Sequence, residues 1–224
     1  LSNGSLKLLG QNATLSCTAA SGGLTHASHM MWLRANGNDI IVDGINFRGN
    51  NRSVYGLVAQ EQVKVYQPSL TVANCTFRNF YIPASNPYYL NSYNETTAVL
   101  SSGPFKNVTI DRCIVQNVSR ATMASQSSLT ASSAGIVIIG ETIGGTYYGP
   151  QTTTVSGCYI ENITSAVTSQ YGNQYNIDCD GLKFFGGNTS GSEYINCRAS
   201  IYGNHFVNCR GRDIKVQADE VVVR

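Results

Sequence analysis

Carboxylate and cationic side chains gather late in the sequence. Two carboxylates that face one substrate can act as general acid and as base or nucleophile. Lysine and arginine beside them can neutralise a charge that a substrate carries or that develops during reaction. The alternative interpretation is an outer row of salt bridges without a catalytic role. The candidate catalytic residues are Asp178, Asp180, Asp213, Lys183, Lys215 and Arg212.

Tyrosines gather in polar segments that separate the apolar ones, at 81–95, 141–150 and 164–180. An exposed aromatic ring with polar neighbours suits a sugar, whose C–H faces are apolar and whose rim carries hydroxyl groups. These rings could instead pack their loops onto the fold or fill an interface between copies of the chain. The candidate substrate-binding residues are Tyr88, Tyr89, Tyr93, Tyr147, Tyr148, Tyr171 and Tyr175.

The elements that must position these residues are repeats. Five stretches share one pattern: 40–50, 70–80, 108–118, 153–163 and 199–209. Aligned, they give four columns: Val42, Val72, Ile110, Val155 and Ile201; Ile45, Cys75, Cys113, Cys158 and Asn204; Phe47, Phe77, Val115, Ile160 and Phe206; Gly49, Asn79, Asn117, Asn162 and Asn208. The apolar positions alternate, which is the period of strands. We expect like columns to stack at the interstrand spacing, with the asparagines in an interior amide ladder.

Each copy is followed by a second apolar stretch, at 55–59, 97–101, 135–139, 181–185 and 213–217. Glycine or asparagine two residues past the first column predicts a bend with positive φ, with Arg112 as the exception. The register places Lys183 and Lys215 one above the other and groups the three aspartates, with an anion expected to offset the two ammonium groups. Residues 1–12 are expected to be irregular, and 62–67 to form one more strand.

The segments between the strands have a predictable placement. Those at 81–95, 119–134 and 164–180 should all leave at one corner, and those at 141–150 and 186–192 at a second. Loops stacked along one edge of a rigid scaffold are where function is expected.

With these columns and loops, the sequence resembles the right-handed parallel β-helices of the pectate-lyase-like superfamily. Within it, the stretches CDGLKFFG (179–186) and NHFVNCRGRDIKVQ (204–217) look like the late coils of bacteriophage tailspikes. The resemblance implies an all-β fold, a right-handed parallel β-helix solenoid of about six coils with long loops stacked on one edge. Residues 1–224 would be a single domain. Because 218–224 begins another coil without a cap, we expect either a fragment of a longer tailspike or an end that another chain covers.

The resemblance implies a receptor-binding protein that recognises and depolymerises bacterial surface polysaccharide, either capsule or O-antigen. A hydrolase would use two of the named carboxylates, and a lyase would use the lysines or Arg212 against a uronic acid. No cofactor is expected, unless a lyase holds Ca²⁺ on Asp178 and Asp180. The alternatives are a glycan-binding or structural spike module that does not cut, and a secreted pectate-lyase-like enzyme.

The expected partners follow from the same resemblance: bacterial surface polysaccharide, two further copies in a homotrimer, and the phage tail or baseplate through regions outside this sequence. The expected location is the virion, after folding in the host cytoplasm, with secretion as the alternative. A net charge of +2 with 12% charged residues offers no basic footprint for nucleic acid. Neither does the sequence contain an apolar run long enough to insert into a membrane.

The cysteines indicate in which cellular compartment the chain folds. Seven is an odd number, and Cys75, Cys113 and Cys158 fall in one column, where thiols behave as small apolar groups. Free stacked thiols favour folding in a reducing cytosol. Sequons such as Asn117 and Asn162 fall in the column expected inside, which argues against glycosylation.

Overall fold

The fold is built entirely from β-strands wherever the structure describes it. The computed structural model describes residues 4–18, 27–63, 65–82, 96–120, 133–165, 179–186 and 197–224. No described residue is helical, and all pairings between long strands are parallel. The all-β class expected from the alternating pattern is therefore confirmed.

The strands form three parallel ladders. The first contains β5 (Ser69–Ala73), β8 (Asn107–Asp111), β13 (Thr152–Ser156), β16 (Arg198–Tyr202) and β19 (Glu220–Val223). The second contains β6 (Thr76–Ile82), β9 (Ile114–Arg120), β14 (Tyr159–Ser165) and β17 (His205–Cys209). The third contains β2 (Ala27–Arg34), β4 (Ser53–Gln60), β7 (Thr96–Ser102), β10 (Ser133–Ile139), β15 (Cys179–Phe185) and β18 (Arg212–Gln217).

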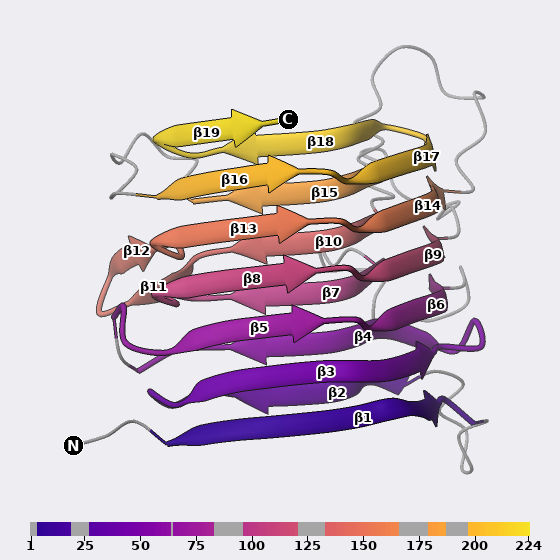
Figure 1. The fold of residues 1–224 in the computed structure, drawn as a ribbon, viewed down its shortest axis with the longest axis horizontal. Coiled ribbons are helices and arrows are strands. Elements are labelled where there is room, and N and C mark those ends of the chain that lie inside the picture. Colours follow the sequence, from indigo (N-terminus) through magenta and orange to yellow (C-terminus); the bar gives the residue numbers. More distant parts are fainter. Residues whose placement is uncertain are drawn as a thin grey trace.

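The long strand β3 (Asp39–Arg48) joins the first two ladders, because its first half pairs with β5 and its second half with β6. Strand β1 (Ser5–Ser16) pairs along β3. From β5 onward the chain visits the first, second and third ladders in the same order each time, and Figure 1 shows the strands stacked in sequence order from β1 to β19. A short antiparallel hairpin of β11 (Glu141–Ile143) and β12 (Thr146–Tyr148) interrupts this order after β10.

The core lies between the ladders and consists of the predicted columns. Val42 pairs with Val72, Val72 with Ile110, Ile110 with Val155, and Val155 with Ile201. All five side chains are buried. In the third column Phe47 and Phe77 stack with ring centroids 4.6 Å apart and planes 6° apart. Similar apolar side chains in register therefore pack in the core, as the alignment of the repeats predicted.

A left-handed residue separates the first ladder from the second in every repeat. The φ values are 67° at Gly44, 51° at Asn74, 48° at Arg112, 60° at Gly157 and 64° at Gly203. Arg112, which lacks the usual residue type, adopts the same bend at a cost of roughly 1 kcal/mol. Its Nε donates to the side-chain oxygen of Asn74 at 2.9 Å, and its Nη1 lies 2.7 Å from the Asp111 carboxylate. The bend prediction is confirmed at the four glycine and asparagine positions, and Arg112, the exception in residue type, adopts the same bend.

The asparagine column forms the predicted ladder, but not inside the fold. Asn117 donates to Asn79 at 3.0 Å, Asn162 to Asn117 at 3.1 Å, and Asn208 to Asn162 at 2.7 Å. Asn117 and Asn208 are exposed and the other two half-buried, so the interior placement was wrong. All four have φ between 53° and 64°. This left-handed backbone turns the amides outward, and asparagine tolerates it better than most residues do.

The cysteine column is buried as predicted. Cys75, Cys113 and Cys158 are each at most 1% exposed, and all seven cysteines are free thiols. Hydrogen bonding to the thiols of Cys158 and Cys75, together with burial, raises the pKa of the Cys113 thiol well above its ordinary value. Burial raises the pKa of Cys197 and of Cys209 to about 12. Because the thiolate is the reactive form, the raised pKa values disfavour reaction of Cys113, Cys197 and Cys209 at neutral pH.

Two local expectations were wrong. Strand β1 begins at Ser5, so the irregular lead-in over residues 1–12 is not observed. The strand expected over 62–67 is not observed either: the described residues of this range, 62–63 and 65–67, form a bend and a turn. The buried Glu61 carboxylate explains this turn, because it accepts hydrogen bonds from the backbone N–H groups of Val63 and Gly37, both at 2.6 Å.

The asparagine ladder predicts a graded effect of two substitutions. Asn117→Ala should lower the free energy of unfolding by about 2 kcal/mol, because alanine is strained at positive φ and the ladder loses its hydrogen bonds. Asn117→Gly should cost about half as much, because glycine adopts this φ freely and only the hydrogen bonds are lost. Urea unfolding followed by circular dichroism measures both. Asn107→Ala is the matched control, since Asn107 is exposed and makes one 3.2 Å bond to Ser69. Equal losses for Asn117→Ala and the control would contradict the ladder's role.

Candidate functional site

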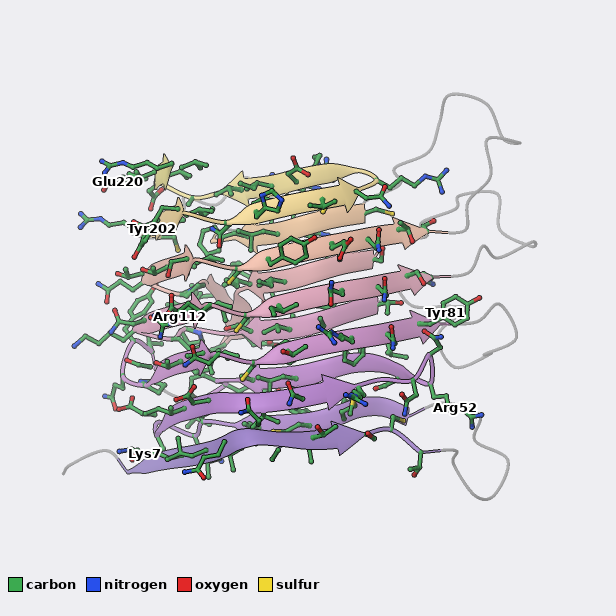
Figure 2. The ribbon with its side chains drawn as sticks, turned by 45° about the vertical axis from the view of Figure 1, so that its right-hand side comes forward. Lys7, Arg52, Tyr81, Arg112, Tyr202 and Glu220 are labelled. Carbon is green, nitrogen blue, oxygen red and sulfur yellow. The ribbon has the colours of Figure 1, made fainter. Side chains whose placement is uncertain are left out.

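The chain leaves the second ladder at one shared edge. The pairing of Tyr81 with Ser119, and of Ser119 with Thr164, places the ends of β6, β9 and β14 side by side. The chain re-enters the third ladder at Thr96, Ser133 and Cys179, which are also neighbours. The three segments expected at one corner therefore start and finish together. Tyr81 lies at this edge (Figure 2). Five of the candidate tyrosines fall outside the described residues: Tyr88, Tyr89, Tyr93, Tyr171 and Tyr175.

The second corner holds the β11–β12 hairpin, which carries Tyr147 and Tyr148. The Tyr147 hydroxyl accepts a hydrogen bond from the Gly140 N–H at 2.9 Å, and burial raises the pKa of this phenol. Tyr148 meets Tyr66 edge to face, with centroids 6.4 Å apart. Both rings are half-buried and pack back onto the fold, which favours the packing alternative for these two tyrosines.

Among the candidate catalytic residues, Asp180 and Arg212 form a two-point ion pair. Register sets Arg212 directly opposite Asp180, and the two Asp180 oxygens lie 2.7 Å from Arg212 Nε and 3.1 Å from Nη2. The Asp180 side chain is fully buried, whereas that of Arg212 is 43% exposed. The next residue of β18, Asp213, is exposed, and Asp178 lies outside the described residues. The pairing partner of Asp180 is thus Arg212 and not a second carboxylate.

Asp180 sits on the outer face because β15 does not alternate regularly. A Cβ on Gly181 would lie 2.6 Å from the Phe206 ring, so position 181 faces the core. Leu182, the next residue, is also buried in the core. Two consecutive inward positions place Asp180 on the opposite side of the strand from Gly181. Strict alternation would have placed Asp180 on the same side as Leu182.

The two lysines lie in register on the outer face, as predicted. Lys183 of β15 pairs with Lys215 of β18. Each Nζ is 5.1 Å from the centroid of the Phe185 ring, a distance at which a cation is attracted to the π face. Phe185 therefore contributes to offsetting the repulsion between two ammonium groups, a role that sequence reasoning had assigned to an anion. Lys183 and Lys215 therefore place two ammonium groups side by side on this part of the third ladder.

The calcium alternative can be tested against Asp180. Calcium in proteins is held by carboxylate and carbonyl oxygens that are free to coordinate it. Both oxygens of Asp180 are engaged by Arg212. Within the described ranges, no three His, Cys, Asp or Glu side chains are arranged to hold a metal ion. Asp180 therefore does not fit a calcium site.

Sequence reasoning missed an aromatic cluster at the other end of the third ladder. His29 stacks between Trp32 at 5.2 Å and Tyr55 at 5.1 Å, measured between ring centroids. The Arg34 guanidinium carbon lies 4.7 Å from the centre of the indole, a contact worth about 0.5–1 kcal/mol at an exposed site. Trp32 nevertheless remains 50% exposed. The available signal was that Trp32 is the single tryptophan of the chain, in a strand with His29 and Arg34.

A polar group beside this cluster was also missed. Glu141 of β11 accepts a hydrogen bond from the Ser102 hydroxyl at 2.6 Å and one from the Gln60 amide at 3.4 Å. Register sets Gln60 opposite Arg34 and next to Ser102. The sequence around Glu141 does not predict these contacts. They form because the β11–β12 hairpin brings Glu141 close to residues that are distant in the chain.

No known protein family matches the chain, and no curated protein or solved structure matches it either. Among the described residues there is no helix long and apolar enough to cross a membrane.

The Asp180–Arg212 pair predicts a large and asymmetric effect on stability. Arg212→Ala should lower the free energy of unfolding by about 2–3 kcal/mol, because it leaves a buried carboxylate uncompensated. Adding Asp180→Asn to that variant should recover a substantial part of the loss, since the buried charge is removed. Chemical unfolding of the three proteins gives the comparison.

The matched control is Arg198→Ala, which breaks the exposed pair with Glu220 at 3.3 Å. Exposed pairs contribute about 0–1 kcal/mol, so this variant should stay close to wild type. If Arg212→Ala were as stable as Arg198→Ala, the buried pair would not have the importance assigned to it.

Proposed function

We propose that this chain is part of a right-handed parallel β-helix of the tailspike type that binds acidic bacterial surface polysaccharide. The fold part of the proposal is supported by the ladders, which the chain visits in a constant order with a left-handed bend at the same place in every repeat. Each turn of such a helix contacts its neighbours alone, so loops of any length can leave at its corners. The segments that leave beside one another from β6, β9 and β14 agree with that design.

The observation that carries the functional proposal is the cationic row on the outer face of β15 and β18. Lys183 of β15 and Lys215 of β18 lie in register on adjacent strands. The nitrogen of each ammonium group is 5.1 Å from the centroid of the Phe185 ring. Regularly spaced cations suit the carboxylates of a uronic acid polymer, and the ladder fixes their spacing at about 4.8 Å. Because the strands already fix where the two lysines emerge, less conformational entropy is lost when a polymer binds.

Cutting of the glycan is the second candidate. A lyase needs cations that neutralise the substrate carboxylate while a base removes the adjacent proton, and the lysine row supplies such cations. In a hydrolase, one carboxyl must be protonated to act as an acid. Asp180 is poorly suited to that role, because it is buried and both of its oxygens accept hydrogen bonds from Arg212. Binding is therefore favoured over cleavage, and a lyase over a hydrolase.

The rest of the proposal concerns assembly. As a tailspike segment, the protein would form a homotrimer on a phage tail or baseplate and would reside in the virion. The free thiols support folding in a reducing cytosol before assembly, and they argue against the secreted alternative.

A panel of purified acidic and neutral capsular polysaccharides tests the proposal by affinity electrophoresis. An acidic polymer should retard the protein. The double variant Lys183→Ala, Lys215→Ala should weaken that binding about tenfold, which corresponds to roughly 1.4 kcal/mol. Added salt should weaken the wild type more than the variant, since charge contacts are screened. Lys7→Ala is the control: Lys7 is exposed on β1, away from the third ladder, and its loss should change nothing.

The same incubations separate binding from cutting. Ultraviolet-absorbing unsaturated ends would identify a lyase, new reducing ends alone a hydrolase, and neither a binding module. Failure of every acidic polymer to bind, or equal binding by the double variant, would overturn the assignment of the lysine row.

A further inference from the structure

The tight turn between β2 and β3 contains a chemically labile dipeptide, Asn36-Gly37. In such a dipeptide the backbone nitrogen of glycine can attack the asparagine side chain, because glycine has no side chain to hinder the approach. Asn36 is exposed, with φ at 47°, and Gly37 follows with φ at 81°. The Asn38 N–H donates to the Ala35 carbonyl at 2.9 Å, which closes a type I′ turn. The turn connects the third ladder to the first (Figure 1).

The backbone nitrogen of Gly37 is held by a buried carboxylate. Its N–H donates to Oε2 of Glu61 at 2.6 Å, and the N–H of Val63 donates to Oε1 at 2.6 Å. Glu61 is 0% exposed, and its own N–H donates to the Ser102 carbonyl at 2.9 Å. The group that binds the Gly37 nitrogen is therefore itself fixed in the fold.

Both ends of the turn are also anchored. The Ala35 N–H donates to the Gln60 carbonyl at 2.8 Å, and the Asp39 N–H donates to the Gly4 carbonyl at 3.1 Å. Ala35 is only 2% exposed. A turn held at both ends and at its centre must break several hydrogen bonds before its backbone can rotate.

The contact with Glu61 opposes the attack in two ways. A peptide unit is planar, so an N–H bond that points at Glu61 fixes the plane of the Gly37 nitrogen. That nitrogen then cannot turn freely toward the side chain of Asn36. The attack also requires the nitrogen to give up its proton, and a negative charge that develops beside a carboxylate is repelled by it.

We propose that Asn36 is a deamidation site that Glu61 holds inactive. In the reaction, a bond forms between the Gly37 nitrogen and Cγ of Asn36, and the bond from Cγ to the side-chain nitrogen breaks. Ammonia leaves with the proton of Gly37, which gives a cyclic imide, and water opens the ring to aspartate or isoaspartate. The product carries a new carboxylate, and isoaspartate also lengthens the backbone of the turn by one methylene. This inference is independent of the proposed glycan binding.

The first test compares the folded full chain with the same chain unfolded in guanidinium chloride, both near neutral pH. Trypsin cleaves after Arg34 and Arg48 and releases the peptide 35–48, whose mass reports the exchange of ammonia for water. Asn36 in the folded chain should convert about tenfold more slowly or less, because the turn must open first. Hydrogen exchange should likewise show a protected Gly37 amide.

Variants of Glu61 then assign the protection. Glu61→Ala should speed the conversion of Asn36 in the folded protein by about tenfold, since a rate limited by local opening follows the opening equilibrium. Glu61→Gln should speed it less, because its single side-chain oxygen can still accept from one of the two N–H donors. Asn117→Ala is the matched control: it removes a hydrogen bond of the second ladder, far from this turn in the chain, and should leave the Asn36 rate unchanged. Circular dichroism checks that each variant folds.

Each remaining outcome contradicts the proposal. Equal rates in the folded and unfolded wild type would show that the turn gives no protection. Equal acceleration by Asn117→Ala and Glu61→Ala would assign the protection to global stability and not to Glu61. Slower conversion in Glu61→Ala than in wild type would show that Glu61 acts as a base that promotes the reaction. If Glu61→Ala does not fold, a folded Glu61→Gln variant with the wild-type rate would overturn the assignment.

Discussion

In-register parallel pairing is the constraint on which the rest of this structure depends. Side chains on a strand alternate between two faces, so a slip of one residue would move the entire core set to the surface. Here the same apolar columns remain aligned from β3 to β16, and every member of the first column stays buried. The stacked Phe47 and Phe77 rings show how closely identical side chains pack when register is kept.

The bends keep the register where the ladders change direction. A left-handed residue between the first and second ladders recurs at equivalent positions, and Arg112 adopts it although it is neither glycine nor asparagine. A second left-handed row within the second ladder carries the amide ladder of Asn79, Asn117 and Asn162. The ladder bonds run between strands, so they also resist slippage of one strand along the next.

The same constraint brings distant parts of the chain together on one face. Residues far apart in the chain, such as Trp32 and Lys215, fall on one line because five register steps connect them. Long segments can be inserted between strands without disturbing that line, since β6, β9 and β14 end side by side whatever follows them. The core columns therefore stabilise the fold, whereas the outward columns and the corners can vary without disturbing it.

The sequence by itself determined the strands of each repeat, the buried columns, the free cysteine stack and the positive-φ bends, because these are set by alternation and by local backbone preference. The vertical pairing of Lys183 with Lys215 followed from the same alignment. Tertiary structure alone decided that Asp180 meets Arg212, that Phe185 serves both lysines, and that Glu141 reaches Ser102. Two consecutive inward residues in β15 and a hairpin after β10 produce these contacts, and neither follows from a strict period of two. The outward asparagines have the same origin, since a left-handed residue reverses the side on which a side chain emerges. A repeated pattern thus fixes which residues share a column, whereas local departures from the pattern fix which atoms meet.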